Sequence, residues 1–180
     1  MKIYRMGYKE GYKSYSMKEK VTRREINALR NLDKLMNNYE KKEMIVSESA
    51  KRADLAYIFS YPGGVIAITD KAKKIFEKYF EASSFEYLPV VCDEGDYYLV
   101  HCINAYNLDL KMEELDNMTF KTYLNETQLN EKKINQKGIF KIKKDNGFIS
   151  PLYVTEFFVE KIKEVGFDSV SFELIWDSDD

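Results

Sequence analysis

The spacing of apolar residues along the chain changes repeatedly between the period of two that is typical of strands and the period of about 3.6 that is typical of helices. Several short apolar runs are rich in β-branched and aromatic residues, which favours strands. These runs cover residues 2–6, 44–50, 65–68, 85–91, 97–103, 118–124 and 139–142. A further apolar segment, 54–59, fits neither period, and we leave it unassigned.

The first helix is predicted to begin at Arg23, because Thr22-Arg-Arg-Glu25 is a capping box. The Thr22 hydroxyl can accept a hydrogen bond from the Glu25 backbone, and the Glu25 side chain can reach back to the Thr22 backbone. Apolar residues then follow at helical spacing, which predicts a helix that ends near residues 37–38. These residues are Ile26, Leu29, Leu32 and Met36.

A second helix is predicted after the run 65–68. Thr69 and Asp70 stand at its start, where hydroxyl and carboxylate groups cap free backbone N–H groups. Its apolar stripe contains Ala72, Ile75, Phe76, Tyr79 and Phe80. A Ser-Phe-Glu sequence at 84–86 then opens the next predicted strand.

The third helix repeats this pattern near the end of the chain. It begins at Thr155 and Glu156, is expected to stop at Gly166, and leads into a second Ser-Phe-Glu sequence at 171–173. Its stripe contains Phe158, Val159, Ile162 and Val165. We interpret the two strand-helix-strand units as a pseudo-repeat, although two such units can also resemble each other by chance.

These elements predict an α+β protein in which helices pack on a mixed or mainly antiparallel sheet. A chain of 180 residues with 44% hydrophobic and 32% charged residues has the composition of one globular domain. We expect a single domain over 1–180, with an N-terminal strand and helix in 1–53 and a core in 54–180. Two cysteines are too few for a secreted disulfide scaffold, and no segment approaches the ~20 apolar residues of a membrane span. The chain also starts without an apolar leader, so we expect it in the cytoplasm.

Charge is distributed unevenly, although the formal net charge is −2. Residues 1–24 are rich in lysine and arginine, whereas the segment after Gly166 has no basic residue and ends in Asp177-Ser-Asp179-Asp180. Such a tail is either a solvated terminus or a surface that attracts a basic partner. Tyrosines and lysines are interleaved near the N-terminus, as in single-stranded nucleic-acid binders, in protein interfaces and in ordinary sheet faces with a basic rim. They are Tyr4, Tyr8, Lys9, Tyr12, Lys13, Tyr15 and Lys18.

Both cysteines and the only histidine of the chain lie in the stretch CDEGDYYLVHC. A two-residue turn in its Glu-Gly dipeptide predicts a hairpin that pairs Cys92 with Tyr97 and Leu88 with His101. The thiols are then too far apart for a disulfide, and His101 and Cys102 point to opposite faces of their strand. We therefore predict half-buried cysteines and a hydrogen-bonded histidine rather than a metal or Cys-His site, although a distant carboxylate could still meet His101.

The sequence has no recognisable catalytic motif. It contains neither a Gly-rich phosphate loop nor a Gly-x-Ser-x-Gly elbow, so we predict that the protein is not an enzyme and uses no cofactor and no metal. With 30 acidic residues present, a carboxylate-based hydrolase stays open as an alternative, because sequence spacing does not show which carboxylates meet.

The succession of segments over residues 54–175 resembles a family of bacterial immunity proteins that was first catalogued as a domain of unknown function. The individual motifs are mostly strand-and-cap patterns, but their order and spacing are fairly specific. They are VIAITDKAK at 65–73, FEYLPV at 85–90, YYLVHCIN at 97–104, LDL at 108–110, IFKI at 139–142, LYVTE at 152–156 and SFE at 171–173. Residues 1–53 match little of the family pattern.

Individual positions agree with this family only in part. A serine or glutamate pair usually follows each strand in the family, and Thr69-Asp70 and Thr155-Glu156 occupy those places here. The Asn-rich stretch of the family is matched by Asn104 and Asn107. Both threonines are better explained as helix caps than as partner contacts.

The resemblance implies a small cytoplasmic protein, encoded beside polymorphic toxins that are delivered between competing bacteria, which binds a cognate toxin and covers its active site. It implies no catalytic residues and no cofactor. We expect the toxin domain as the partner, with no membrane and no nucleic acid involved, and leave weak self-association open. Exposed acidic and aromatic residues would make the contact. The candidates are Asp93, Glu94, Asp96, Tyr97, Tyr106, Asp177, Asp179 and Asp180.

Two alternatives from other classes stay open. One is a nucleic-acid-associated module that uses the N-terminal Lys-Tyr face, and the other is the carboxylate-based hydrolase. The first needs exposed tyrosines beside lysines, and the second needs two carboxylates in one pocket with separated pKa values.

Overall fold

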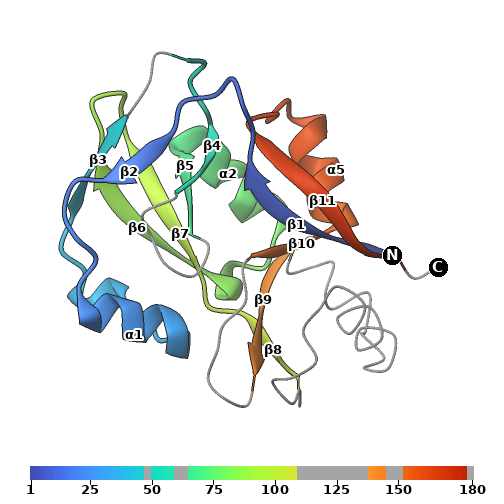
Figure 1. The fold of residues 1–180 in the computed structure, drawn as a ribbon, viewed down its shortest axis with the longest axis horizontal. Coiled ribbons are helices and arrows are strands. Elements are labelled where there is room, and N and C mark those ends of the chain that lie inside the picture. The colour runs from blue at the N-terminus through green and yellow to red at the C-terminus, as the bar shows by residue number, and fades with distance from the viewer. Residues whose placement is uncertain (47–49, 59–64, 109–137, 145–151, 178–180) are drawn as a thin grey trace.

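A computed structural model of the protein describes residues 1–46, 50–58, 65–108, 138–144 and 152–177. Within these ranges the chain forms two sheets and three α-helices, which make a single α+β domain (Figure 1). The predicted fold class is therefore confirmed. The predicted strand at 118–124 lies outside the described residues.

The first sheet has six strands in the order β2-β3-β6-β7-β5-β4. Neighbouring strands are antiparallel, except that β3 runs parallel to β6. The segment left unassigned at 54–59 supplies the edge strand β4. The strands are β2 Tyr15–Met17, β3 Lys42–Val46, β4 Leu55–Tyr57, β5 Ile66–Thr69, β6 Phe85–Val91 and β7 Tyr97–Cys102.

The second sheet has five strands in the order β11-β1-β10-β9-β8, with a parallel β8–β9 pair and otherwise antiparallel neighbours. The chain crosses from the first sheet into the second directly after β7. The strands are β1 Lys2–Tyr8, β8 Ala105–Leu108, β9 Ile139–Lys144, β10 Tyr153–Thr155 and β11 Val170–Asp177. Because β1 lies between β10 and β11, the N-terminal segment is a central part of the second sheet.

The helices α2 (Asp70–Tyr79) and α5 (Glu156–Glu164) begin where the sequence predicts, since Thr69 and Thr155 accept N-cap hydrogen bonds. Each helix links two strands that lie on either side of a third, because β5 and β6 flank β7 while β10 and β11 flank β1. The helices meet in a core between the sheets, where the Phe76 and Phe158 rings are edge to face with centroids 5.6 Å apart.

The helix α1 (Arg23–Asn31) forms its predicted capping box with Thr22 but ends earlier than expected. Leu32 adopts a left-handed backbone conformation with φ 61°, and the Asp33 N–H donates to the Ala28 carbonyl, which closes the last turn. Met36 therefore does not continue the apolar stripe. It lies in a short 3-10 turn, Met36–Asn38, and is 45% exposed; a second such turn covers Ala82–Ser84.

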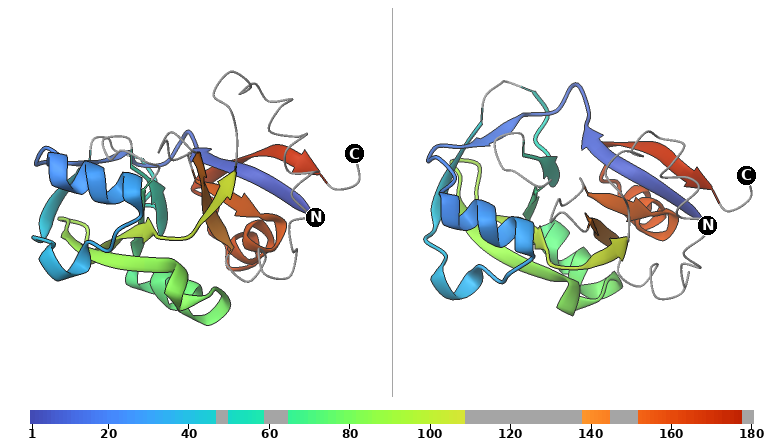
Figure 2. Two further views of the ribbon diagram at one scale, coloured as in Figure 1. Left: turned by 90° about the horizontal axis from the view of Figure 1, so that it is seen from below. Right: turned by 60° about the horizontal axis from the view of Figure 1, so that its bottom comes forward.

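The two faces of the six-stranded sheet bury different cores. Figure 2 shows α1 on one face of this sheet and α2 on the other. Leu29 of α1 packs with Leu88, Leu99 and other residues of one face, while Ile66, Ile68 and Val100 face α2. None of the helices in the described ranges has the length and apolar character needed to cross a bilayer.

The predicted register of the β6–β7 hairpin is wrong by two residues. Tyr97 pairs with Val90 instead of Cys92, and His101 pairs with Glu86 instead of Leu88. The reason is the connection, which spans 92–96 rather than two residues and is closed by a hydrogen bond from the Gly95 N–H to the Cys92 carbonyl at 3.0 Å. The two cysteines lie at opposite ends of the hairpin and form no disulfide, and both are buried rather than half-buried as predicted.

Candidate functional site

The tip of the β6–β7 hairpin, residues 92–96, lies at one end of the molecule beside two other connections (Figure 1, upper left). The turn between β1 and β2 is held to the segment before β4, because the Lys13 N–H donates to the Lys51 carbonyl and the Lys51 N–H donates to the Gly11 carbonyl. The tip rests on that segment, since a Cβ atom at Gly95 would lie 3.5 Å from a guanidinium nitrogen of Arg52. We call this region the hairpin end.

Two buried tyrosines fasten the hairpin end from inside. The Tyr15 hydroxyl donates to Glu94 Oε2 at 3.0 Å and lies 3.1 Å from the Tyr97 hydroxyl. The Tyr97 hydroxyl donates to the Ala53 carbonyl at 3.0 Å and accepts a hydrogen bond from Arg52 Nε at 3.3 Å. Burial raises the pKa of both phenols, so they remain neutral donors.

This network changes the role of two predicted contact residues. Tyr97 is 1% exposed, so it cannot serve as an aromatic anchor for a partner. Glu94 is half-buried and bound to Lys13 and Tyr15. Partial burial opposes its ionisation, but the bonds from Lys13 and Tyr15 outweigh this and hold its pKa below the ordinary value. Both residues shape the tip rather than present a free contact.

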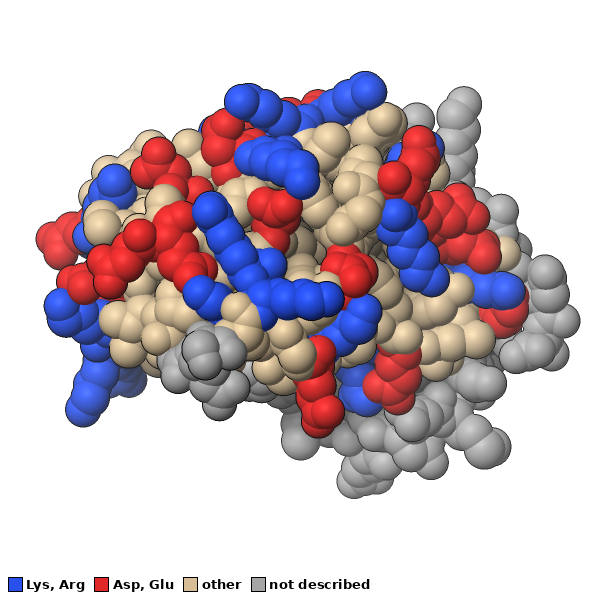
Figure 3. Space-filling view, turned by 90° about the horizontal axis from the view of Figure 1, so that it is seen from above, with Lys and Arg blue, Asp and Glu red and all other residues tan. Residues whose placement is uncertain are grey.

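Asp93 and Asp96 remain as the free carboxylates of the tip. Both are exposed, and neither forms a hydrogen bond or ion pair within the part of the chain that the structure describes. Figure 3 shows this end of the molecule from above, with acidic side chains gathered at the left and lysines and arginines beside them in the middle. The tip therefore offers negative charge on a well-anchored support.

A shallow hollow of about 470 Å³ lies next to the tip and tests the hydrolase alternative. Two of its three carboxylates already have partners, because Asp54 accepts from Thr69 Oγ1 at 2.8 Å and Asp70 is 2.7 Å from Lys74. The hydrogen bond from Lys74 holds the pKa of Asp70 below its ordinary value, whereas a general acid needs a raised one. The lining residues are Arg52, Asp54, Thr69, Asp70, Lys71 and Asp96.

The N-terminal tyrosines do not form the exposed face that the nucleic-acid alternative needs. Tyr12 and Tyr15 are buried in the core beside α1, at 8% and 1% exposure. The Tyr12 hydroxyl is bound to Asp168, and the Tyr8 hydroxyl donates to the Tyr12 carbonyl at 2.8 Å. Base stacking requires free ring faces, which Tyr12 and Tyr15 lack.

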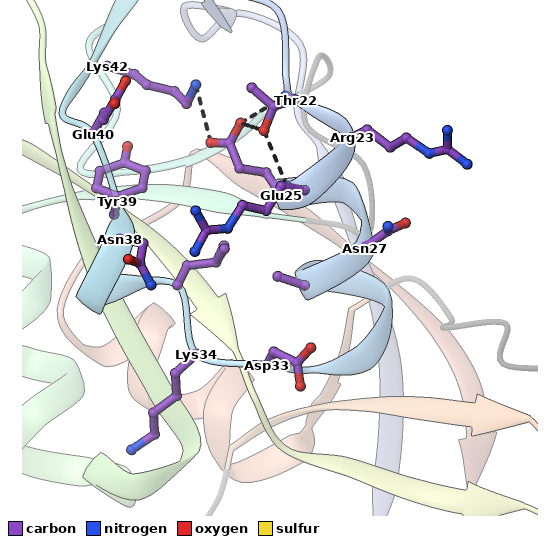
Figure 4. A pocket seen from close by; sticks show the side chains of 13 residues that line it. Thr22, Arg23, Glu25, Asn27, Asp33, Lys34, Asn38, Tyr39, Glu40 and Lys42 are labelled. Atoms are coloured by element: carbon purple, nitrogen blue, oxygen red, sulfur yellow. Dashed lines mark hydrogen bonds and ion pairs between the residues drawn. The ribbon is translucent and has the colours of Figure 1, made fainter.

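A larger pocket of about 680 Å³ lies between α1 and the chain that follows it (Figure 4). Its walls carry both signs of charge, and Glu25 is bound there to Lys42 at 3.2 Å and to Thr22. In Figure 4 the Arg23 side chain points away from the pocket, while the Tyr39 hydroxyl points toward Glu40 and Lys42. Glu25 and Lys42 are paired with each other, and the other charged residues of the walls are of both signs, so this pocket has no dominant sign that would select a ligand.

A buried polar cluster lies where the chain crosses between the sheets, and sequence reasoning missed it. Glu86 accepts hydrogen bonds from the Leu35 and Met36 N–H groups at 2.8 and 3.1 Å, and from His101 Nδ1 at 2.9 Å. Lys141 of β9 is fully buried, and its charge opposes protonation of His101. We call Glu86, His101 and Lys141 the junction cluster.

The junction cluster is incompletely paired. Neither His101 Nε2 nor Lys141 Nζ has a hydrogen-bond partner among the described residues. Burial lowers the pKa of both groups, and in His101 the hydrogen bond with Glu86 opposes this effect. The predicted hydrogen-bonded histidine is thus confirmed at Nδ1 and wrong at Nε2. No set of three His, Cys, Asp or Glu residues suited to a metal ion occurs within the described ranges.

The remaining predicted contact residues lie far from the tip or outside the described part. Asp177 ends β11 and is 3.6 Å from Lys2, so β1 already provides a positive partner for it. Tyr106 belongs to β8, but its side chain is outside the described part, and so are Asp179 and Asp180. The structure therefore brings Asp93, Glu94, Asp96 and Tyr97 together at the hairpin end.

Two comparisons with known proteins found no related protein. A scan against protein-family models gives no match. A search of the curated proteins also gives no significant match. We therefore infer a function from the geometry of the chain and from the pattern of its sequence.

Proposed function

We propose that this protein is a cytoplasmic immunity protein that binds a cognate bacterial toxin domain and covers its active site. The pattern of segments over 54–175 motivates this proposal. The observation that carries it is the hairpin end, where Asp93 and Asp96 are exposed on a tip that buried tyrosines hold in place.

The construction of the tip suits the blocking of a basic active site. Association is favoured when the contacting groups are already ordered, because less conformational entropy is lost on binding. The bonds of Glu94 to Tyr15 and Lys13 order the tip before any partner arrives. Exposed carboxylates then attract a cationic substrate channel and speed the encounter. A toxin that cleaves or modifies a phosphate-containing substrate would present such a channel.

Co-expression tests the proposal directly. The chain is produced in bacteria together with the toxin-like domain encoded by the open reading frame immediately upstream, and both survival and co-purification are scored. We expect survival and a stable complex. Survival without a complex would instead indicate an enzyme that reverses the damage. If the cells do not survive and no complex is found, the proposal is overturned.

A further inference from the structure

Two aliphatic side chains are exposed next to the hairpin tip. Ile45 on β3 is 44% exposed and Val91 at the end of β6 is 48% exposed. Their neighbours Met44 and Val90 are 2% and 1% exposed and face the core beside α1. Because successive side chains of a strand alternate between faces, Ile45 and Val91 both point to the opposite face of the sheet.

The register of the strands places these two residues close together. In the parallel β3–β6 pair, Glu43 lies opposite Val91. Ile45 follows Glu43 by two residues and therefore lies on the same face, one step farther along. Lys73 of α2 covers another part of this face, with its ammonium 4.4 Å from the Tyr98 ring centroid. The sheet face thus has one part under α2 and one part open at the hairpin end.

Carboxylates lie beside the open part. Lys18 forms an ion pair with Glu43 at 2.7 Å, and Glu19 accepts a hydrogen bond from the Glu43 N–H at 3.1 Å. Glu43, and then Glu19 and Asp93, raise the pKa of Lys18, as carboxylates near an ammonium do. Three carboxylates and the one ammonium that they share thus lie beside the two aliphatic side chains, and acidic groups are in excess among these four.

We propose that Ile45 and Val91, bordered by Glu19, Glu43 and Asp93, form the surface on which the toxin docks, and that the toxin presents an apolar centre with a rim of lysines and arginines. We call this surface the Ile45–Val91 patch. The inference rests on the proposed function and specifies its contact surface.

The composition of the Ile45–Val91 patch supports a basic partner over a second copy of the chain. Stable interfaces commonly have an apolar centre surrounded by a polar rim, and exposed aliphatic residues in such a centre lose water when the partner binds. A two-fold contact between two copies would bring like-charged rims together, which is repulsive. A basic surface neutralises the same rim.

Substitution of the apolar centre tests the inference. Ile45→Lys and Val91→Lys each place a positive charge at the centre, and each should weaken binding of the purified toxin domain at least about tenfold, measured by calorimetry. Leu174→Lys is the matched control, because Leu174 is 49% exposed but lies on β11 in the other sheet. This control should bind like the unmodified chain.

A second variant separates the outcomes. Val91→Thr keeps the β-branched shape, so a severalfold loss of affinity with this variant would exclude unfolding as the cause. Binding by the unmodified chain together with undiminished binding by all patch variants would overturn the inference and leave the proposed function intact. An equal loss with Leu174→Lys would also overturn it. Absence of binding by the unmodified chain would overturn both.

Discussion

The hairpin end and the junction cluster both bury polar side chains, but they differ in how completely these side chains are hydrogen-bonded. At the hairpin end, the hydroxyls of Tyr15 and Tyr97 each have a donor and an acceptor within the network. In the junction cluster, Glu86 has three donors, whereas His101 Nε2 and Lys141 Nζ have no partner among the described residues. One region therefore gains order from its polar groups, and the other carries an energetic penalty.

The difference follows from what each region joins. At the hairpin end, side chains from several loops meet at the tip of a hairpin. Backbone and carboxylate groups are therefore both within reach of each tyrosine hydroxyl. The junction cluster lies under a strand crossover, where the positions of His101 and Lys141 are dictated by the registers of β7 and β9. Buried polar groups without partners cost about 1–3 kcal/mol each and are less common in native proteins.

The largest effect should come from removing the one fully paired member of the junction cluster. Glu86→Ala leaves the Leu35 and Met36 N–H groups and His101 Nδ1 without their acceptor. We expect a loss of about 3–5 kcal/mol in the free energy of unfolding, measured by urea titration with circular dichroism. Glu160→Ala on the exposed surface of α5 is the control and should change little. A loss below about 1 kcal/mol would show that Glu86 does not organise the cluster.

Substitution of Lys141 should instead raise the free energy of unfolding. Lys141→Met removes an unpaired ammonium from a fully buried position and keeps a side chain of similar length. We expect an increase of about 1–4 kcal/mol in the free energy of unfolding, because an isolated buried charge or amine is costly. The same urea titration measures it. A loss of stability would mean that Lys141 is as well paired as the two tyrosines of the hairpin end.

The gain in stability from Lys141→Met should depend on pH. Burial lowers the pKa of Lys141 in the folded protein, whereas in the unfolded chain it returns to about 10.5. Above that pH the amine is neutral in both the folded and the unfolded chain, so burial of a charge does not lower the free energy of unfolding. As the pH falls below it, protonation favours the unfolded chain until the folded-state pKa is reached. The advantage of Lys141→Met should therefore be smallest above about pH 10.5, grow toward lower pH and then level off. A gain that does not depend on pH would contradict a buried amine that titrates.

At the hairpin end, removal of one hydroxyl should lower the free energy of unfolding by a smaller amount than Glu86→Ala does. Tyr97→Phe takes the donor from the Ala53 carbonyl and the acceptor from Arg52 Nε, while the ring keeps its packing. We expect a loss of about 1–2 kcal/mol in the free energy of unfolding, measured by thermal and urea denaturation. Tyr98→Phe, on the other side of the same strand, is the matched control. Equal effects of the two variants would show that the Tyr97 hydroxyl is no more constrained than a surface phenol.

The predictability of these regions from sequence depends on how local their determinants are. The helix starts at Thr22, Thr69 and Thr155 were predicted because each cap involves residues only three positions apart. The contact between Glu86 and His101 was missed because the hairpin connection was taken as two residues, which shifts the register of the strands by two.

Burial was harder still to predict where it depends on the second sheet. Lys141 has the alternation expected of a strand residue, and a lysine in such a run is normally assigned to the solvent face. It is buried because β9 packs beside β7, where His101 and Cys102 lie near its side chain, and this contact joins residues distant in the chain. Tyr97 was expected at the surface for a related reason, since Tyr15 and Ala53, which enclose it, come from remote segments.

The smallest effect on stability, and a clear effect on binding, is expected at the free carboxylates of the hairpin end. The tyrosine network holds the tip without Asp93 and Asp96, so the double variant Asp93→Asn, Asp96→Asn should change the free energy of unfolding by less than about 0.5 kcal/mol. Its association with the toxin domain should be about two- to tenfold slower at low ionic strength, and the difference should shrink in high salt, because the attraction is screened. Stopped-flow fluorescence at two salt concentrations measures both rates. An unchanged rate at low salt would mean that the tip, although rigid and acidic, takes no part in guiding the partner.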